Sequence, residues 1–187
     1  IRGDTSLRSQ DRGNGIHLFN TTGALIEGND ISETRDAIYI ETANRNTIRG
    51  NVMSDLRYGI HYMYSMHNLL ENNVTRGTRT GYALMQSKYL KVFNNRSEND
   101  ENYGILMNFI TNSELRNNVV TGVSQGQSAG VVISGAEGKA VFIYNSLYNT
   151  FEGNYFGHSN IGIHLTAGSE ENQVFNNAFV ENQRQVK

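Results

Sequence analysis

The sequence predicts an all-β protein, a right-handed parallel β-helix of about seven coils with three short strands in each coil. Three observations lead to this prediction. A repeat of 22 residues runs along the chain, its apolar positions alternate with a period of two, and asparagine returns at one fixed place in every repeat. Repeats of this length are typical of solenoids, in which successive coils stack and bury a shared core.

A small residue opens each repeat. The opening residues are Gly15, Ala37, Gly59, Gly81, Gly104, Gly130 and Gly162. The fourth, fifth and sixth repeats are longer by about one, four and ten residues. We place the extra length of the sixth repeat at about 136–149, either as a flap that packs on its own coil or as a segment that contacts a partner. Residues 1–187 are thus expected to form a single β-helix domain.

The strands follow from apolar pairs that have one residue between their members, as half-buried strands do. The first inward pairs are Ile16/Leu18, Ile38/Ile40, Ile60/Tyr62, Tyr82/Leu84, Val131/Ile133 and Ile163/Leu165. A second inward column is Ile26, Ile48, Leu70, Val92, Leu115, Phe151 and Val174. A third inward column is Ile31, Met53, Thr75, Ser97, Val120, Phe156 and Phe179.

Asparagine and charged residues complete the pattern. The chain has 25 asparagines, and one column of them is Asn29, Asn51, Asn73, Asn95, Asn118, Asn154 and Asn177. Because an amide both donates and accepts, stacked copies are expected to form a hydrogen-bonded ladder. Glu27 and Arg49 should pair on neighbouring coils, and Glu33 and Asp55 should offset an arginine column that contains Arg57.

Composition narrows the function classes. The net charge is −2 and the pI is about 6.2, which disfavours nucleic-acid binding. The chain has no cysteine, so thiolate metal sites are excluded, and it has no apolar run long enough to span a membrane. Ile1-Arg2-Gly3-Asp4 matches segments that lie late in later repeats. We therefore expect both ends to be open and the chain to be a fragment of a longer protein.

One segment concentrates soft metal ligands. His61, Met63, Met66 and His67 lie within seven residues, and Met85 occupies the column of Met63 one coil later. Neutral thioether and imidazole groups select Cu(I) over hard cations when no thiolate is present. These five residues are the candidate metal ligands. The competing interpretation is that methionine and aromatic side chains simply fill gaps on a β-surface.

Catalytic patterns give no support to an enzyme. A polysaccharide lyase or epimerase needs carboxylates that converge with a base or a cation in one groove. Glu41 is isolated in its column, and Asp36 and Asp55 are assigned to corners of the coil. We therefore predict a non-enzyme, with a polysaccharide-binding or polysaccharide-modifying β-helix as the alternative. Carboxylates from different faces could still meet in space.

The segments Gly59-Ile-His-Tyr-Met-Tyr-Ser-Met-His-Asn68, Gly81-Tyr-Ala-Leu-Met85 and Tyr103-Gly-Ile-Leu-Met-Asn108 carry a family resemblance. The chain resembles the NosD family of periplasmic β-helix proteins, part of a wider group of carbohydrate-binding and sugar-hydrolase β-helix domains. That resemblance implies a non-catalytic periplasmic accessory role in copper delivery to nitrous oxide reductase or in maturation of its copper sites. The implied partners are the ABC transporter NosFY and the reductase, rather than a glycan.

Overall fold

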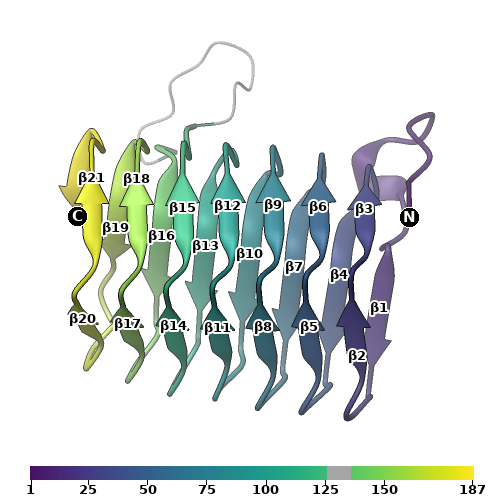
Figure 1. Cartoon of the computed structure of the whole chain (residues 1–187), viewed down its shortest axis with the longest axis horizontal. Coiled ribbons are helices and arrows are strands. Elements are labelled where there is room, and N and C mark those ends of the chain that lie inside the picture. The colour runs from purple at the N-terminus through teal and green to yellow at the C-terminus, as the bar shows by residue number, and fades with distance from the viewer. Residues whose placement is uncertain (126–135) are drawn as a thin grey trace.

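The computed structural model describes residues 1–125 and 136–187, which form a parallel β-solenoid of 22 strands and one short 3₁₀ helix, Ser9–Asp11. Successive coils lie side by side along the long axis of the molecule, with the N-terminus at one end and the C-terminus at the other (Figure 1). The strands form three parallel sheets, one of eight strands and two of seven. The predicted fold class is therefore confirmed.

Each coil contributes one strand to each sheet. The first sheet contains β1 (Ile16–Phe19), β4 (Asp36–Glu41), β7 (Tyr58–Met63), β10 (Thr80–Met85), β13 (Tyr103–Asn108), β16 (Lys139–Tyr144), β19 (Ile161–Leu165) and β22 (Arg184–Val186). The second contains β2 (Leu25–Glu27), β5 (Thr47–Arg49), β8 (Leu69–Glu71), β11 (Lys91–Phe93), β14 (Glu114–Arg116), β17 (Thr150–Glu152) and β20 (Gln173–Phe175). The third contains β3 (Asp30–Ser32), β6 (Val52–Ser54), β9 (Val74–Arg76), β12 (Arg96–Glu98), β15 (Val119–Thr121), β18 (Tyr155–Gly157) and β21 (Ala178–Val180).

The core is a set of vertical columns inside the coils. In β7 the side chains of Ile60 and Tyr62 are buried, whereas His61 and Met63 between and after them are partly exposed. The register keeps this alternation in phase, since Ile60 lies opposite Ile38 on β4 and Tyr82 on β10. The inward columns predicted from the sequence are found in the described coils, although Val174 in the last coil is 37% exposed.

The asparagine ladder is present. Asn73 Oδ1 accepts from the Asn51 amide at 3.0 Å, and Asn95 Oδ1 accepts from the Asn73 amide at 3.0 Å. The ladder continues through Asn118, Asn154 and Asn177. Serine hydroxyls form another interior column that the sequence analysis missed, for example where the Ser65 backbone N–H donates to Ser87 Oγ at 3.1 Å. These bonds satisfy backbone groups at corners where no sheet continues.

A close approach between coils explains the small opening residue. A Cβ added to Gly81 would lie 2.7 Å from the Gly104 carbonyl oxygen and 2.6 Å from Asp100 Oδ2. Neither oxygen has room to retreat, because both belong to a buried neighbouring coil. A larger side chain at this position would therefore push two coils apart.

The sixth coil differs from the sequence-based prediction in the position of its first-sheet strand. Its first-sheet strand is β16, in which Val141 and Ile143 pair with Ile105 and Met107 of β13. Lys139–Tyr144 was assigned to the insertion at about 136–149, so that assignment is wrong for these residues. The extra length lies between β15 and β16, because the sequence offset between neighbouring coils rises to 36 residues there and returns to 23 in the next coil. The predicted opening Gly130 and the pair Val131/Ile133 lie outside the described residues.

Candidate functional site

The outer face of the first sheet carries three of the five predicted metal ligands. His61 and Met63 point outward from β7, two residues apart, because the alternate positions Ile60 and Tyr62 fill the core. Met85 lies directly opposite Met63 on the neighbouring strand β10. Side chains on one face of adjacent strands lie within reach of each other, including diagonal neighbours. The fold therefore groups His61, Met63 and Met85.

Packing and hydrogen bonds hold the His61 ring in place. The imidazole stacks on Tyr39 with ring centroids 4.7 Å apart and meets the edge of Tyr58 at 5.0 Å. Its Nδ1 lies 3.1 Å from Asp36 Oδ2, and 12% of the side chain is exposed. Its Nε2 is buried and has no hydrogen-bond partner within residues 1–125 and 136–187. The ring therefore has one nitrogen engaged and one free.

Asp36 is the residue that fixes this arrangement. Its side chain is fully buried, and its two oxygens accept from Arg57 Nε at 2.8 Å and Nη2 at 2.7 Å. Burial acts to raise the pKa of Asp36, but the hydrogen bonds from His61 and Arg57 outweigh burial and lower this pKa below its ordinary value. An ionised carboxylate only accepts hydrogen bonds. Nδ1 of His61 is therefore assigned a proton, and in the neutral ring the lone pair lies on Nε2.

These pairs differ from those predicted from the sequence. Glu33 and Asp55 were expected to offset the arginine column, but Arg57 pairs with Asp36, and Glu33 pairs with Arg2. The Glu27–Arg49 pair on neighbouring coils is confirmed, with Oε1 2.7 Å from Nε.

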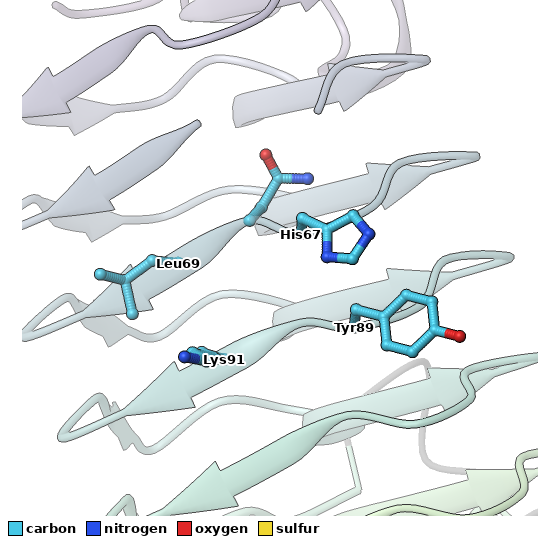
Figure 2. A pocket seen from close by; sticks show the side chains of 5 residues that line it. His67, Leu69, Tyr89 and Lys91 are labelled. Atoms are coloured by element: carbon cyan, nitrogen blue, oxygen red, sulfur yellow. The ribbon is translucent and has the colours of Figure 1, made fainter. Parts of the chain in front are cut away.

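Met66 and His67 lie elsewhere, at the corner between the first and second sheets. Met66 forms an isolated bridge with Lys88 and is 37% exposed. His67 stacks on Tyr89 of the next coil, with centroids 4.8 Å apart and an interplanar angle of 6°. Figure 2 shows the two rings next to each other; together with Asn68, Leu69 and Lys91 they line a pocket. The structure thus separates these two residues from the group on the first sheet.

Large exposed side chains gather at this same corner. The described residues between 42 and 150 include seven exposed large apolar side chains, and six of them lie at or beside the corner: Tyr64, Met66, Tyr89, Phe109, Tyr144 and Tyr148. Four of the aromatic residues adopt a positive φ, between 52° and 58°: Tyr64, Tyr89, Phe109 and Tyr148. The equivalent turn positions in other coils also have a positive φ, for example Thr42 and Gln86, so the conformation belongs to the coil and aromatic side chains occupy it here. We call this set the aromatic corner.

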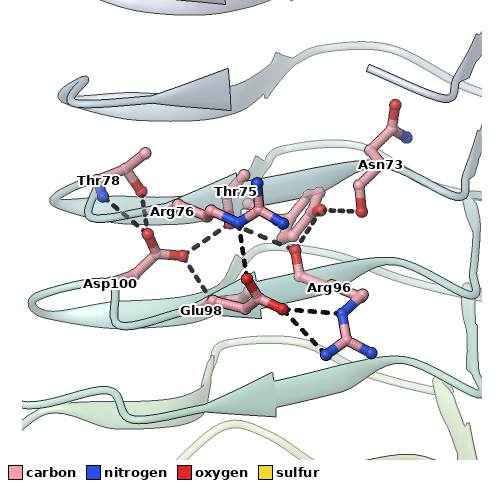
Figure 3. A network of polar contacts seen from close by, with 9 residues as sticks. Asn73, Thr75, Arg76, Thr78, Arg96, Glu98 and Asp100 are labelled. Atoms are coloured by element: carbon pink, nitrogen blue, oxygen red, sulfur yellow. Dashed lines mark hydrogen bonds and ion pairs between the residues drawn. The ribbon is translucent and has the colours of Figure 1, made fainter. Parts of the chain in front are cut away.

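A second buried carboxylate has a structural role. Asp100 accepts hydrogen bonds from Thr75 Oγ1 at 2.7 Å, Ser97 Oγ at 2.6 Å, and both the backbone N–H and the hydroxyl of Thr78 at 2.8 and 2.7 Å (Figure 3). Burial raises the pKa of Asp100 even though these donors act to lower it. Thr75 lies on β9 and Ser97 on β12 of the third sheet, and Thr78 lies in the turn that follows β9, so Asp100 ties two neighbouring coils together.

In the described part of the chain, His, Cys, Asp and Glu side chains do not gather in threes in a way that could hold a metal ion. Among the same residues, none of the helices has the length and apolarity needed to cross a membrane.

Comparison with known proteins gives clear matches. The family model described as "Periplasmic copper-binding protein (NosD)" matches residues 1–187. A "Probable ABC transporter binding protein NosD" from Pseudomonas aeruginosa is 65% identical over 187 residues, and one from Stutzerimonas stutzeri is 61% identical over 188. Each match covers 100% of this chain but only 44% and 43% of the relative, so the chain spans less than half their length.

Among solved structures, an alginate lyase from Paenibacillus sp. str. FPU-7 matches with a TM-score of 0.32 and 12% identity, over 98% of this chain and 86% of that chain. This likeness is too weak to bear on function.

Proposed function

Since the chain belongs to the NosD family of periplasmic copper-binding proteins, we propose that it is a non-catalytic accessory module that carries Cu(I) to nitrous oxide reductase in the periplasm. It would act with an ABC transporter of the NosFY type. The observation that carries this proposal is the family match over all 187 residues. The names of two relatives, which describe binding to an ABC transporter, support the transporter as a partner.

The donor atoms support copper as the cargo. His61, Met63 and Met85 offer one imidazole nitrogen and two thioether sulfurs from one face of the sheet. The buried and unpartnered Nε2 of His61 fits a metal ligand, because such ligands usually have their second nitrogen bound to a carboxylate. Bound there, Cu(I) would be held by soft neutral ligands that suit its release to another soft site.

The aromatic corner is the surface best suited to dock the recipient. Tyr64 directly follows Met63, so this corner borders the proposed copper ligands. Copper passes between proteins by ligand exchange, which requires the donor and acceptor sites to touch. Exposed aromatic side chains are the residues that most often anchor protein interfaces. We therefore assign the apo-reductase, rather than a glycan, as the occupant of the corner.

Engagement of the two buried carboxylates gives the polysaccharide alternative less support. Asp36 is held by Arg57 and His61, and Asp100 by three hydroxyls and a backbone N–H. A general acid or base needs a proton that can reach a substrate. These two groups are committed to partners inside the fold.

A binding measurement tests the proposal. Apo-reductase is immobilised, and both this chain and the full-length protein are passed over it with and without Cu(I). The double variant Tyr64→Ser/Tyr89→Ser should weaken binding at least tenfold, whereas Val52→Ser, an exposed apolar residue on the third sheet, should not. Failure of the full-length protein to bind the reductase, or turnover of a uronate polymer, would overturn the proposed function.

A further inference from the structure

We infer that His61 Nε2, Met63 and Met85 bind one Cu(I) ion on the outer face of the first sheet, and that Asp36 and Arg57 position the imidazole for it. This inference deepens the proposed function and rests on copper being the cargo. It also removes Met66 and His67 from the set of ligands, because the structure places them at the corner.

Asp36 sets the direction in which the His61 imidazole points. Asp36 stands in register with Tyr58, at the start of β7, and its Oδ2 accepts the hydrogen bond from His61 Nδ1 on that side. The two nitrogens of an imidazole ring point in widely different directions, so Nε2 faces away from Asp36. Met63 lies two residues after His61 on the same strand. The copper ion is therefore placed between Nε2, on the side of the ring away from Asp36, and the thioethers of Met63 and Met85.

The second nitrogen of the ring, His61 Nε2, has no hydrogen-bond partner among the described residues. A buried acceptor without a donor is unfavourable, and native proteins keep few of them. His61 Nε2 is such an atom among the described residues, even though its ring is fixed by two aromatic contacts and a carboxylate. A carboxylate–histidine pair with the other nitrogen free is the arrangement found behind metal-ligating histidines. A bound metal ion would satisfy this atom.

Met63 and Met85 provide two thioether sulfurs on the same face of the sheet as His61. Met63 and Met85 face each other across neighbouring strands, which lie about 4.8 Å apart. Both side chains are partly exposed, so their sulfurs have room to turn toward a common point. Glu41 completes the row on the other side of Met63 and adds negative charge beside a cation. Two sulfurs and one nitrogen form a neutral, soft, three-coordinate set that favours Cu(I) over Zn²⁺.

Arg57 holds the Asp36 carboxylate in place. Its two hydrogen bonds to Asp36, at 2.8 and 2.7 Å, hold both carboxylate oxygens in a fixed plane. The oxygen that accepts from His61 is one of these two. Asp36 and Arg57 are therefore positioning residues, which act on copper only through the orientation of the imidazole.

The test is a Cu(I) competition titration against a chromophoric chelator, with this chain under reducing conditions. We expect one Cu(I) per chain, and Met63→Leu/Met85→Leu should weaken binding at least tenfold. The control is Met66→Leu/His67→Gln, which removes the two other candidate ligands, at the corner, and should leave the affinity unchanged. X-ray absorption of the copper-loaded wild-type chain should show two sulfur and one nitrogen neighbours.

The positioning role has its own readout. Asp36→Asn should weaken Cu(I) binding roughly 10- to 100-fold, in the range found for residues that support a metal ligand. Nitrogen NMR of the metal-free chain should also show the His61 proton moving from Nδ1 toward Nε2. Loss of affinity without this tautomer shift would show that Asp36 acts only on the fold, and would overturn its positioning role.

Three results would overturn the site itself. They are no Cu(I) binding by the wild-type chain, equal weakening by the corner control, and a copper environment without sulfur. If the full-length protein still binds Cu(I) and the reductase in any of these cases, the proposed function stands and only this site falls. If the full-length protein binds neither, the proposed function falls with it.

Discussion

Replacing Asn95 by alanine should lower the free energy of unfolding by about 4 kcal/mol. The Asn95 side chain makes four hydrogen bonds. It accepts from the Asn73 backbone N–H and amide, both at 3.0 Å, and donates to the Leu70 carbonyl at 3.0 Å and to Asn118 Oδ1 at 3.1 Å. Each buried hydrogen bond contributes about 1 kcal/mol net, and the partners left behind are buried away from water.

Asn177 is the matched control, because it makes the same kind of contacts in the last coil. Its side chain also accepts two bonds from Asn154 and donates two to carbonyls, all at 2.9 Å. It is only half-buried, so water can replace the lost partners. Asn177→Ala should therefore cost no more than about 2 kcal/mol.

Urea unfolding followed by circular dichroism measures both losses, and similar m-values would show that the two variants unfold to comparable states. Equal destabilisation by Asn95→Ala and Asn177→Ala would refute the reasoning, since burial is the difference between the two sites.

Two further outcomes follow from buried polar groups. Tyr62→Phe should leave the unfolding free energy unchanged or raise it, because the buried Tyr62 hydroxyl has no partner among the described residues. Tyr82→Phe should lower the unfolding free energy by about 1 kcal/mol, because the Tyr82 hydroxyl lies 3.0 and 2.9 Å from two carbonyl oxygens. As the pH rises from 3 to 7, the unfolding free energy of the wild type should fall relative to that of Asp100→Asn. Its pKa is raised in the folded state, so its contribution is full below the ordinary value of 3.8 and is lost as the pH passes through the raised pKa.

Thermal unfolding of the two tyrosine variants side by side checks the first outcome, and a larger loss for Tyr62→Phe than for Tyr82→Phe would contradict it. Unfolding at several pH values checks the second. A stability difference between the wild type and Asp100→Asn that stays flat or moves the other way would show that burial of the carboxylate is not the controlling effect.

The columns of the fold could be predicted because a stacked repeat converts a fixed sequence spacing into spatial contact. Asn51 and Asn73 are 22 residues apart and meet directly. The sixth coil was harder, since Gly130-Val-Val-Ile and Ala140-Val-Phe-Ile fit the strand pattern equally well. The asparagine spacing held the answer. Ala140 lies 14 residues before Asn154, the same spacing that separates Gly81 from Asn95.

Only part of the candidate site could be predicted from the sequence, because its polar contacts run diagonally between columns. Arg57 and Asp36 are 21 residues apart, and His61 and Asp36 are 25 apart, so neither pair shares a column. Alternation along β7 identified His61 and Met63 as outward, and the register brought Met85 beside Met63. Met66 and His67 were expected on the adjoining corner, but the spacing could not show that His67 stacks there on Tyr89 of the next coil.

All three sheets are parallel, and the hydrogen bonds that join one coil to the next run along the length of the molecule. A pushing force applied at one end is therefore carried by stacked side chains through every layer to the other end. A pulling force instead loads the ladders at each boundary in series, and the weakest boundary parts first. The module would behave as a strut, stiff when compressed and separable between two layers when stretched.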